Sequence, residues 1–282
     1  MTALHEADAS DVRVKRRNPW RWLRFAVALI ITAIVLVPVA VVALLALRPG
    51  INSTSHALFT FANLSNVFRT TQLTTWLGNS LAVTLSTVAV AVAAPAGYVL
   101  SRGRSRAVSG YSLLLFIVQS LPVITALIPL FILFAKLHLV DSLFGIGIIY
   151  VGVSMSVAVW MMAAYMDSIP VSLEQAAWID GASLFGGFYR IVLRNSLPGI
   201  LSTAIFTYLV SWNDYLVAIV FIRTQTKYTL PLGVETFFQQ NVIDWADVMA
   251  VAIVIMAPPV IVFACLHRYF SVGGIGGSLA GQ

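Results

Sequence analysis

The chain has 282 residues, of which 59% are hydrophobic and 10% are charged, and its mean hydropathy is +0.90. Because soluble domains carry about 25% charged residues, this composition excludes an ordinary globular domain and indicates a polytopic membrane protein. The formal net charge is +6 at pH 7. The basic residues gather at the ends of apolar runs, which favours a membrane-topology signal over nucleic-acid binding. A single cysteine, Cys265, excludes an intrachain disulfide.

Six apolar runs are long enough to cross a bilayer as helices, which takes about 20 residues each. They cover residues 25–47, 77–100, 111–134, 146–166, 200–222 and 249–267. The first run is longer than the apolar part of a signal peptide, which is about 7–15 residues, so a retained helix is expected. The sequence therefore predicts an all-α, multi-pass protein of the cytoplasmic membrane with six transmembrane helices.

Lysine and arginine set the expected orientation, because they accumulate on the cytoplasmic side of spanning segments. Most of them lie before the first run and in the loops after the second and fourth runs, so both termini are expected in the cytoplasm. The chain then divides into a basic tail, a six-helix membrane domain and a second cytoplasmic tail, at residues 1–24, 25–270 and 271–282. The longest cytoplasmic loop covers residues 167–199, and the long external loop before the last span covers residues 223–248.

The cytoplasmic loop carries local signals for a short, rigid helix. Pro170 interrupts the preceding span, and Ser172 with Gln175 three residues later predicts a capping box. The residues from 173 to 180 favour helix. Gly181 is placed to end that helix in the left-handed conformation.

A second helix is expected over residues 184–194, with Ser183 as its N-cap and Pro198 leading into the next span. The loop is thus predicted to form a helix–glycine–helix hairpin at the membrane surface. Glu174 and Asp180 are expected to stay solvated unless a partner supplies a cation. The alternative is an amphipathic interfacial helix that only connects two spans.

This loop resembles the signature of binding-protein-dependent ABC importer permeases. That pattern is Glu-Ala-Ala, three residues, Gly, nine residues, then Ile-x-Leu-Pro, and the matching residues are Ala176, Ala177, Gly181, Ile191 and Leu193. Two positions depart from it: Gln175 replaces the signature Glu, and Arg194 replaces the usual Pro.

Other segments resemble the maltose-type carbohydrate permeases of the same family. These are VSWNDYL (210–216), TLPLG (229–233), DWADVMA (244–250) and HRYFSVGGIGG (267–277). The resemblance covers about 77–277, and it implies a six-helix type I ABC importer permease fold.

The resemblance also implies a mechanism and partners. In that family the loop docks as a coupling helix on a cytoplasmic ATPase, which binds ATP and Mg and drives the spans between inward-open and outward-open states. The expected partners are a second homologous permease, two ATPase subunits, an external solute-binding protein and a carbohydrate. The implied ATPase-coupling residues are Glu174, Gln175, Ala176, Ala177, Asp180 and Gly181.

The external loop of maltose-type permeases reaches into the sugar-binding protein. By resemblance, the candidate contacts here are Tyr228, Leu230, Glu235, Phe237 and Gln239. The alternative is a folded external cap that contacts no partner.

Asp214 is an acid inside an apolar run, and such groups usually face a cavity or a partner. Sugars are commonly bound by Asp and Asn oxygens and by flat aromatic faces. The candidate substrate-pathway residues are therefore Trp212, Asn213, Asp214 and Tyr215. Two interpretations remain open for the polar pair, lining of the pathway or hydrogen bonding to a neighbouring helix. No Lys or Arg lies deep in a run, which favours a neutral solute over a strongly anionic one.

The chain lacks the G-x-x-x-x-G-K-[ST] phosphate loop, so hydrolysis of ATP is expected on separate subunits. The four histidines are scattered and no nucleophile–base pair is recognisable, so no metal site, cofactor or catalytic residue is assigned to this chain. The alternatives are an ABC permease for a glycerol phosphate or related solute and, from another class, a secondary transporter. The latter usually needs paired intramembrane acids or an inverted repeat.

Overall fold

The computed structural model describes residues 20–50, 58–88, 93–239 and 242–270, and within these ranges the chain is helical and has no strand. The expected N-terminal tail lies mostly outside the described residues, and the expected C-terminal tail lies wholly outside them.

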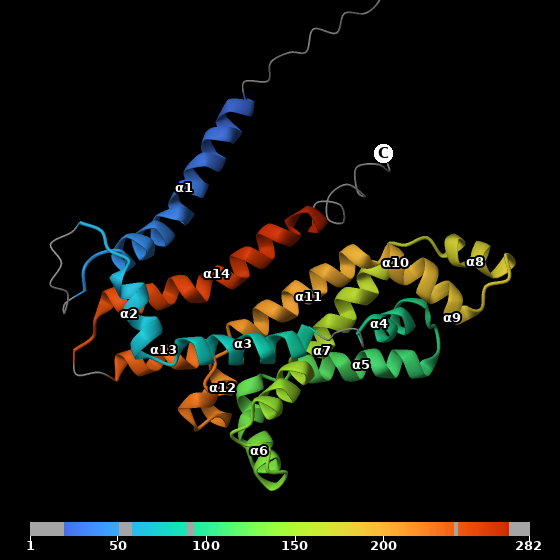
Figure 1. Cartoon of the computed structure of the whole chain (residues 1–282). Coiled ribbons are helices and arrows are strands. Elements are labelled where there is room, and N and C mark those ends of the chain that lie inside the picture. The colour runs from blue at the N-terminus through green and yellow to red at the C-terminus, as the bar shows by residue number, and fades with distance from the viewer. Residues whose placement is uncertain (1–19, 51–57, 89–92, 240–241, 271–282) are drawn as a thin grey trace, which may run out of the picture.

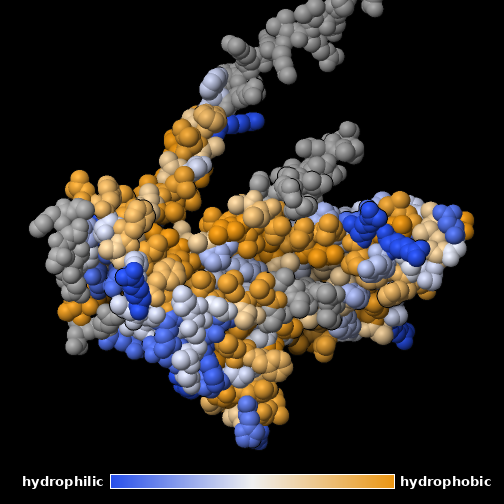
Figure 2. Space-filling model, viewed as in Figure 1, coloured by the Kyte–Doolittle hydropathy of each residue, from blue (hydrophilic) through white to orange (hydrophobic). Residues whose placement is uncertain are grey.

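Three described helices are each long and apolar enough to cross a membrane, over residues 22–46, 143–167 and 245–266. They belong to α1 (Trp20–Ala46), α7 (Leu143–Asp167) and α14 (Trp245–Phe270). Helix α1 packs on α14 at one end and diverges from the other helices over the rest of its length (Figure 1). Figure 2 shows apolar residues over the surfaces of α1 and α14, as expected for helices that face lipid.

None of the other three predicted spans is described as one continuous helix: two are interrupted, and residues 89–92 of the third lie outside the described residues. They divide into the pairs α3 (Leu73–Val88) and α4 (Ala93–Arg102), α5 (Arg106–Ser120) and α6 (Val123–Lys136), and α11 (Leu197–Trp212) and α12 (Leu216–Phe221). Helices α5 and α6 meet at an angle of 96°. If this bent pair counts as one span, the described residues hold four.

Local chemistry explains the interruptions after α5 and after α11. Pro122 precedes α6 and pushes Leu121 into an extended conformation, because the proline ring disfavours helix in the residue before it. After α11, the Asn213 amide donates to the carbonyl of Leu209, and Asp214 accepts from the amide of Val217. Such side-chain hydrogen bonds compete with the backbone hydrogen bonds of the helix. Counting the apolar residues of the run therefore does not predict the break.

The cytoplasmic loop forms the predicted hairpin. Its elements are α8 (Val171–Ile179), α9 (Leu184–Gly187), the π-helix η2 (Phe188–Val192) and α10 (Leu193–Asn195). Ser183 caps α9 by accepting from the amide of Gly186 at 3.0 Å, as predicted. The predicted capping box is wrong: α8 starts directly after Pro170, so Ser172 already lies within its first turn and makes no cap bond.

The segments predicted to be external form α2 (Ala62–Thr70), the 3-10 helix η3 (Gln225–Lys227) and α13 (Leu230–Phe238). Figure 1 shows α2 and α13 at one end of the molecule and α8 and α9 at the other. This separation agrees with the expected placement of the two loops on opposite sides of a membrane.

Helix α7 lies at the centre of the fold and contacts α3, α4, α5, α11 and α12. Its first half packs with α6 and α12, and its second half packs with α4 and η2. The third apolar cluster joins α3, α11, α13 and α14. Helix α7 therefore connects the part of the core around α6 and α12 with the base of the hairpin at η2.

Candidate functional site

The inner face of α8 carries a buried carboxylate, Glu174, that is bonded to residues of α4. The Glu174 side chain is 1% exposed, and its Oε1 accepts from Arg102 Nε at 2.8 Å. Its Oε2 accepts from the Tyr98 hydroxyl at 2.7 Å. The expectation that Glu174 stays solvated is wrong, because the end of α4 supplies a cation and a hydroxyl from within the chain.

The opposite face of α8 is open. Gln175, Ala176 and Asp180 are exposed, and Ala177 is half-buried. At the end of the helix Ile179 is 86% exposed. Leu184 and Phe185, just beyond the turn, are also exposed. We call six of the exposed residues around this turn the docking face: Gln175, Ala176, Ile179, Asp180, Leu184 and Phe185.

Gly181 makes the turn between the two helices of the hairpin with φ at +87°, as the sequence predicts. Around it the amide of Ala182 donates to the carbonyl of Ala177 at 2.9 Å, and the Gly181 amide donates to Trp178. A Cβ added at Gly181 would meet no atom within 4 Å. The requirement for glycine therefore comes from the backbone conformation and not from crowding.

The four candidate pathway residues do not converge on one surface. Trp212 is buried and stacks on Tyr208, with ring centroids 5.6 Å apart. Asn213 is exposed at the end of α11. Tyr215 donates to Glu235 Oε2 at 2.5 Å. Helix α11 ends at Trp212, so the four residues do not lie on one continuous helix.

Asp214 forms a hydrogen bond to a neighbouring helix, which is one of the two interpretations left open by the sequence. Its Oδ2 accepts from the Tyr150 hydroxyl of α7 at 2.7 Å and from the amide of Val217 at 3.0 Å. The carboxylate thus joins α7 to the break between α11 and α12. A role of Asp214 or Asn213 in the pathway stays a prediction.

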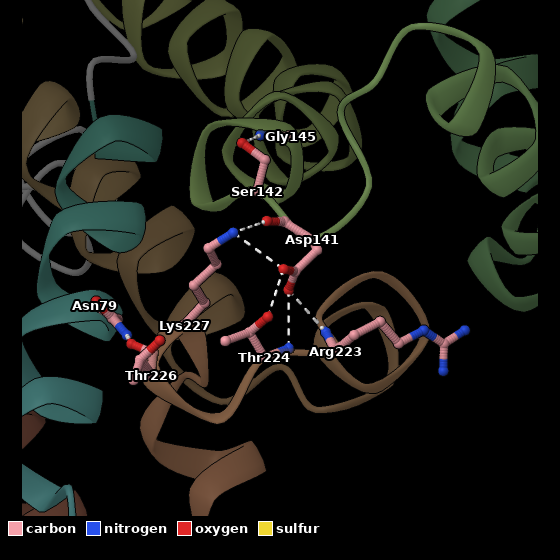
Figure 3. A network of polar contacts seen from close by, with 8 residues as sticks. All are labelled: Asn79, Asp141, Ser142, Gly145, Arg223, Thr224, Thr226 and Lys227. Atoms are coloured by element: carbon pink, nitrogen blue, oxygen red, sulfur yellow. Dashed lines mark hydrogen bonds and ion pairs between the residues drawn. The ribbon is translucent and has the colours of Figure 1, made fainter.

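At the end predicted to be external, the turn before α7 is bonded to the segment after α12, as Figure 3 shows. Asp141 Oδ1 accepts from the amides of Arg223 and Thr224, each at 2.9 Å. Its Oδ2 accepts from the Thr224 hydroxyl at 2.7 Å and from Lys227 Nζ at 3.0 Å. We call this group the Asp141 clamp, comprising Asp141, Arg223, Thr224 and Lys227.

The Asp141 carboxylate is stabilised by these donors. Burial raises its pKa, but the hydrogen bonds from Thr224, Arg223 and Lys227 outweigh burial and hold the pKa well below its usual value. Nearby, the Asn79 amide of α3 donates to the carbonyls of Thr226 and Tyr228, each at 2.9 Å. The first part of the external loop is therefore fixed to both α3 and α7.

The candidate binding-protein contacts differ in exposure. Gln239 is exposed, and Tyr228 and Glu235 are half-buried. Leu230 and Phe237 are buried in the apolar cluster around Trp76, so their expected availability to a partner is wrong. The reason is that α13 lays one face on the core, and the Leu230 amide also donates to Ser80 Oγ at 2.6 Å.

Several residues that shape these sites were missed from the sequence. Arg102 and Tyr98 end an apolar run, where a basic residue is read as a topology signal. Asp141 and Lys227 lie 86 positions apart. For Ile179 a signal was present, since an apolar residue next to a glycine turn in a polar loop is exposed unless a partner covers it.

Comparisons with known proteins agree with this fold. Residues 93–272 match the family described as "Binding-protein-dependent transport system inner membrane component". The inner membrane ABC transporter permease protein YcjP of Escherichia coli is 31% identical over 205 residues, covering 72% of this chain and 73% of that protein. The maltodextrin transport system permease protein MalD of Streptococcus pneumoniae is 27% identical over 272 residues, covering 94% and 96%.

Among solved structures, a bacterial ABC transporter involved in the import of the acidic polysaccharide alginate contains a chain of the same fold. The TM-score is 0.72 at 20% sequence identity, over 89% of this chain and 96% of that chain. The overall fold described above is therefore a known one.

Proposed function

The chain belongs to the family of binding-protein-dependent transport system inner membrane components, and from this premise we propose that it is the permease subunit of an ATP-driven importer for a carbohydrate. The observation that carries the proposal is the match over residues 93–272, which includes the whole cytoplasmic hairpin. Membership of this family makes the chain a translocation component of a cell membrane.

A carbohydrate substrate is supported by the relatives. MalD belongs to a maltodextrin transport system. In the described helices, lysine and arginine lie at or near helix ends. A pathway without a deep cation suits a neutral sugar or oligosaccharide better than a glycerol phosphate, which would favour a buried positive charge.

The docking face supports an ATPase partner. Exposed Ile179, Leu184 and Phe185 lie beside Asp180 at the end of the molecule that also carries the basic loops. Several large apolar side chains that are exposed within one short hairpin, with polar neighbours, are typical of a protein-binding surface. We assign it to the cleft of a cytoplasmic ATPase subunit that binds ATP and Mg, while a second permease and an external solute-binding protein complete the importer.

Co-purification tests this function. The tagged chain is isolated from its native host in mild detergent, the associated proteins are identified, and ATP hydrolysis is measured with and without maltodextrin and the co-purified binding protein. The proposal predicts stoichiometric amounts of an ATPase and a second permease, with stimulated hydrolysis. A stable homo-oligomer without an ATPase would contradict it and favour an ion-driven transporter.

A further inference from the structure

Three side chains join the hairpin that begins with α8 to the helices of the core. Tyr98 and Arg102 come from the last two turns of α4, and Glu174 comes from the first turn of α8. We call them the Arg102 anchor. The Arg102 side chain is 16% exposed and that of Glu174 is 1% exposed, so the pair lies inside the protein and not on a solvated surface.

Every nitrogen of the Arg102 guanidinium has a partner. Nε donates to Glu174, and Nη2 donates to the carbonyl of Ile169, just after α7, at 2.9 Å. Nη1 donates to Ser101 Oγ at 3.1 Å, and Ser101 donates to Asp167 at the end of α7. One cation therefore connects the ends of α4 and α7 with the start of α8. The rigid fork of arginine makes this arrangement directional.

A buried ion pair with several directional hydrogen bonds favours one orientation of a helix. Neighbouring residues on a helix point about 100° apart. If α8 rotated by one position, Leu173 or Gln175 would replace Glu174 against Arg102, and the buried cation would lose its counter-ion. Breaking such a pair by removing one partner is strongly unfavourable, whereas replacing both partners with apolar residues is often tolerated.

We propose that Arg102 and Glu174 are positioning residues that set the orientation of α8, so that its docking face points away from the core. The inference rests on the proposed function in one respect, that the docking face meets an ATPase. Glu174 then does not contact the ATPase itself. It transmits a displacement of α8 directly to α4 and α7, while Gly181 and the π-helix η2 lie on the other side of the hairpin.

The first experiment measures the position of α8 in the full chain alone. Cysteines for spin labels replace the exposed residues Ser172 of α8 and Ser109 of α5, in a Cys265→Ser background and in lipid nanodiscs. The distance distribution is recorded by pulsed electron paramagnetic resonance. Arg102→Met is expected to broaden or shift it, and the matched control Arg104→Gln, which removes an exposed charge two positions away, is expected to leave it unchanged.

The double variant Arg102→Met/Glu174→Met separates positioning from folding. It leaves no buried charge unpaired, so the chain is expected to insert and unfold at close to the wild-type temperature. Its α8 distance distribution is nevertheless expected to stay broad, because apolar contact does not fix a rotation as hydrogen bonds do. A narrow wild-type distribution in the double variant would overturn the proposal.

The second experiment measures coupling in the complex purified with this chain. Solute imported per ATP hydrolysed is expected to fall roughly tenfold or more in the double variant, because small misplacements of positioned groups have effects of this size. Wild-type coupling in that variant would also overturn the proposal. If no ATPase co-purifies, the proposed function fails, but the distance measurement still decides whether the anchor orients α8.

Discussion

The Gly181 turn offers a sharp test, because the structure isolates one physical cause. The residue has φ at +87°, yet an added Cβ would meet no atom within 4 Å. The Cβ of Gly181→Val therefore meets no neighbour, and the main expected effect is on the backbone conformation. A β-branched residue in this region costs about 1–3 kcal/mol, which corresponds to roughly a 5–150-fold loss of the native turn relative to other conformations.

The assay compares a series of variants in the assembled transporter. Solute uptake and ATP hydrolysis are measured for Gly181→Val, for Gly181→Asn, and for the control Gly110→Ala in α5. Asparagine tolerates the left-handed conformation, so its variant should keep most of the activity. Gly110 also has open space but lies within a helix, where alanine is preferred, so its variant should be active and slightly more stable.

The expected order of uptake is wild type and Gly110→Ala, then Gly181→Asn, then Gly181→Val, at equal amounts of inserted protein. Full uptake in Gly181→Val would refute the reasoning. Equal losses in the Asn and Val variants would also refute it, because the effect would then not follow the backbone conformation.

Three further predictions concern contacts at other places in the fold. Asp141→Asn should lower the free energy of unfolding by about 1–3 kcal/mol at pH 7, since the substitution replaces a charged acceptor of four hydrogen bonds with a neutral amide that has one acceptor oxygen. Because the pKa of Asp141 is lower in the folded than in the unfolded state, the carboxylate stabilises the fold above the unfolded pKa of about 3.9, and this stabilisation is lost as the pH falls further. The difference in unfolding temperature between wild type and variant should therefore shrink below about pH 4. A difference that does not change with pH would contradict this account. Tyr150→Phe should destabilise the chain by about 1 kcal/mol by removing the donor to Asp214; an unchanged unfolding temperature with lost transport would instead favour a pathway role for that acid. Ile179→Ala should leave the unfolding temperature unchanged, because the side chain is 86% exposed, but should weaken ATPase capture by about tenfold; undiminished capture on titration with the ATPase would count against the docking face.

The features that the sequence predicts correctly depend on neighbouring residues. Apolar runs identify α1, α7 and α14, since length and composition are enough for a helix in lipid. Gly181 and Ser183 are identified because a left-handed turn and an N-cap are decided within a few positions of the chain.

The features that the sequence does not predict depend on partners that are distant along the chain. Glu174 and Arg102 are 72 positions apart, so nothing near Glu174 indicates that its cation is already present. Leu230 and Phe237 are expected at a partner surface by resemblance to the maltose-type permeases, but α13 folds back onto Trp76. The bend at Pro122 falls within an apolar run, where a count of residues cannot distinguish a straight span from a bent one.

The central claim is that this chain carries a carbohydrate across a membrane at the expense of ATP hydrolysed on other subunits. The most direct measurement is uptake of labelled maltodextrin into proteoliposomes that contain the complex purified through this chain, with its binding protein outside and ATP inside. The account predicts uptake that needs both ATP and the binding protein and that is lost in Gly181→Val. Uptake that proceeds without ATP and follows an ion gradient would contradict it.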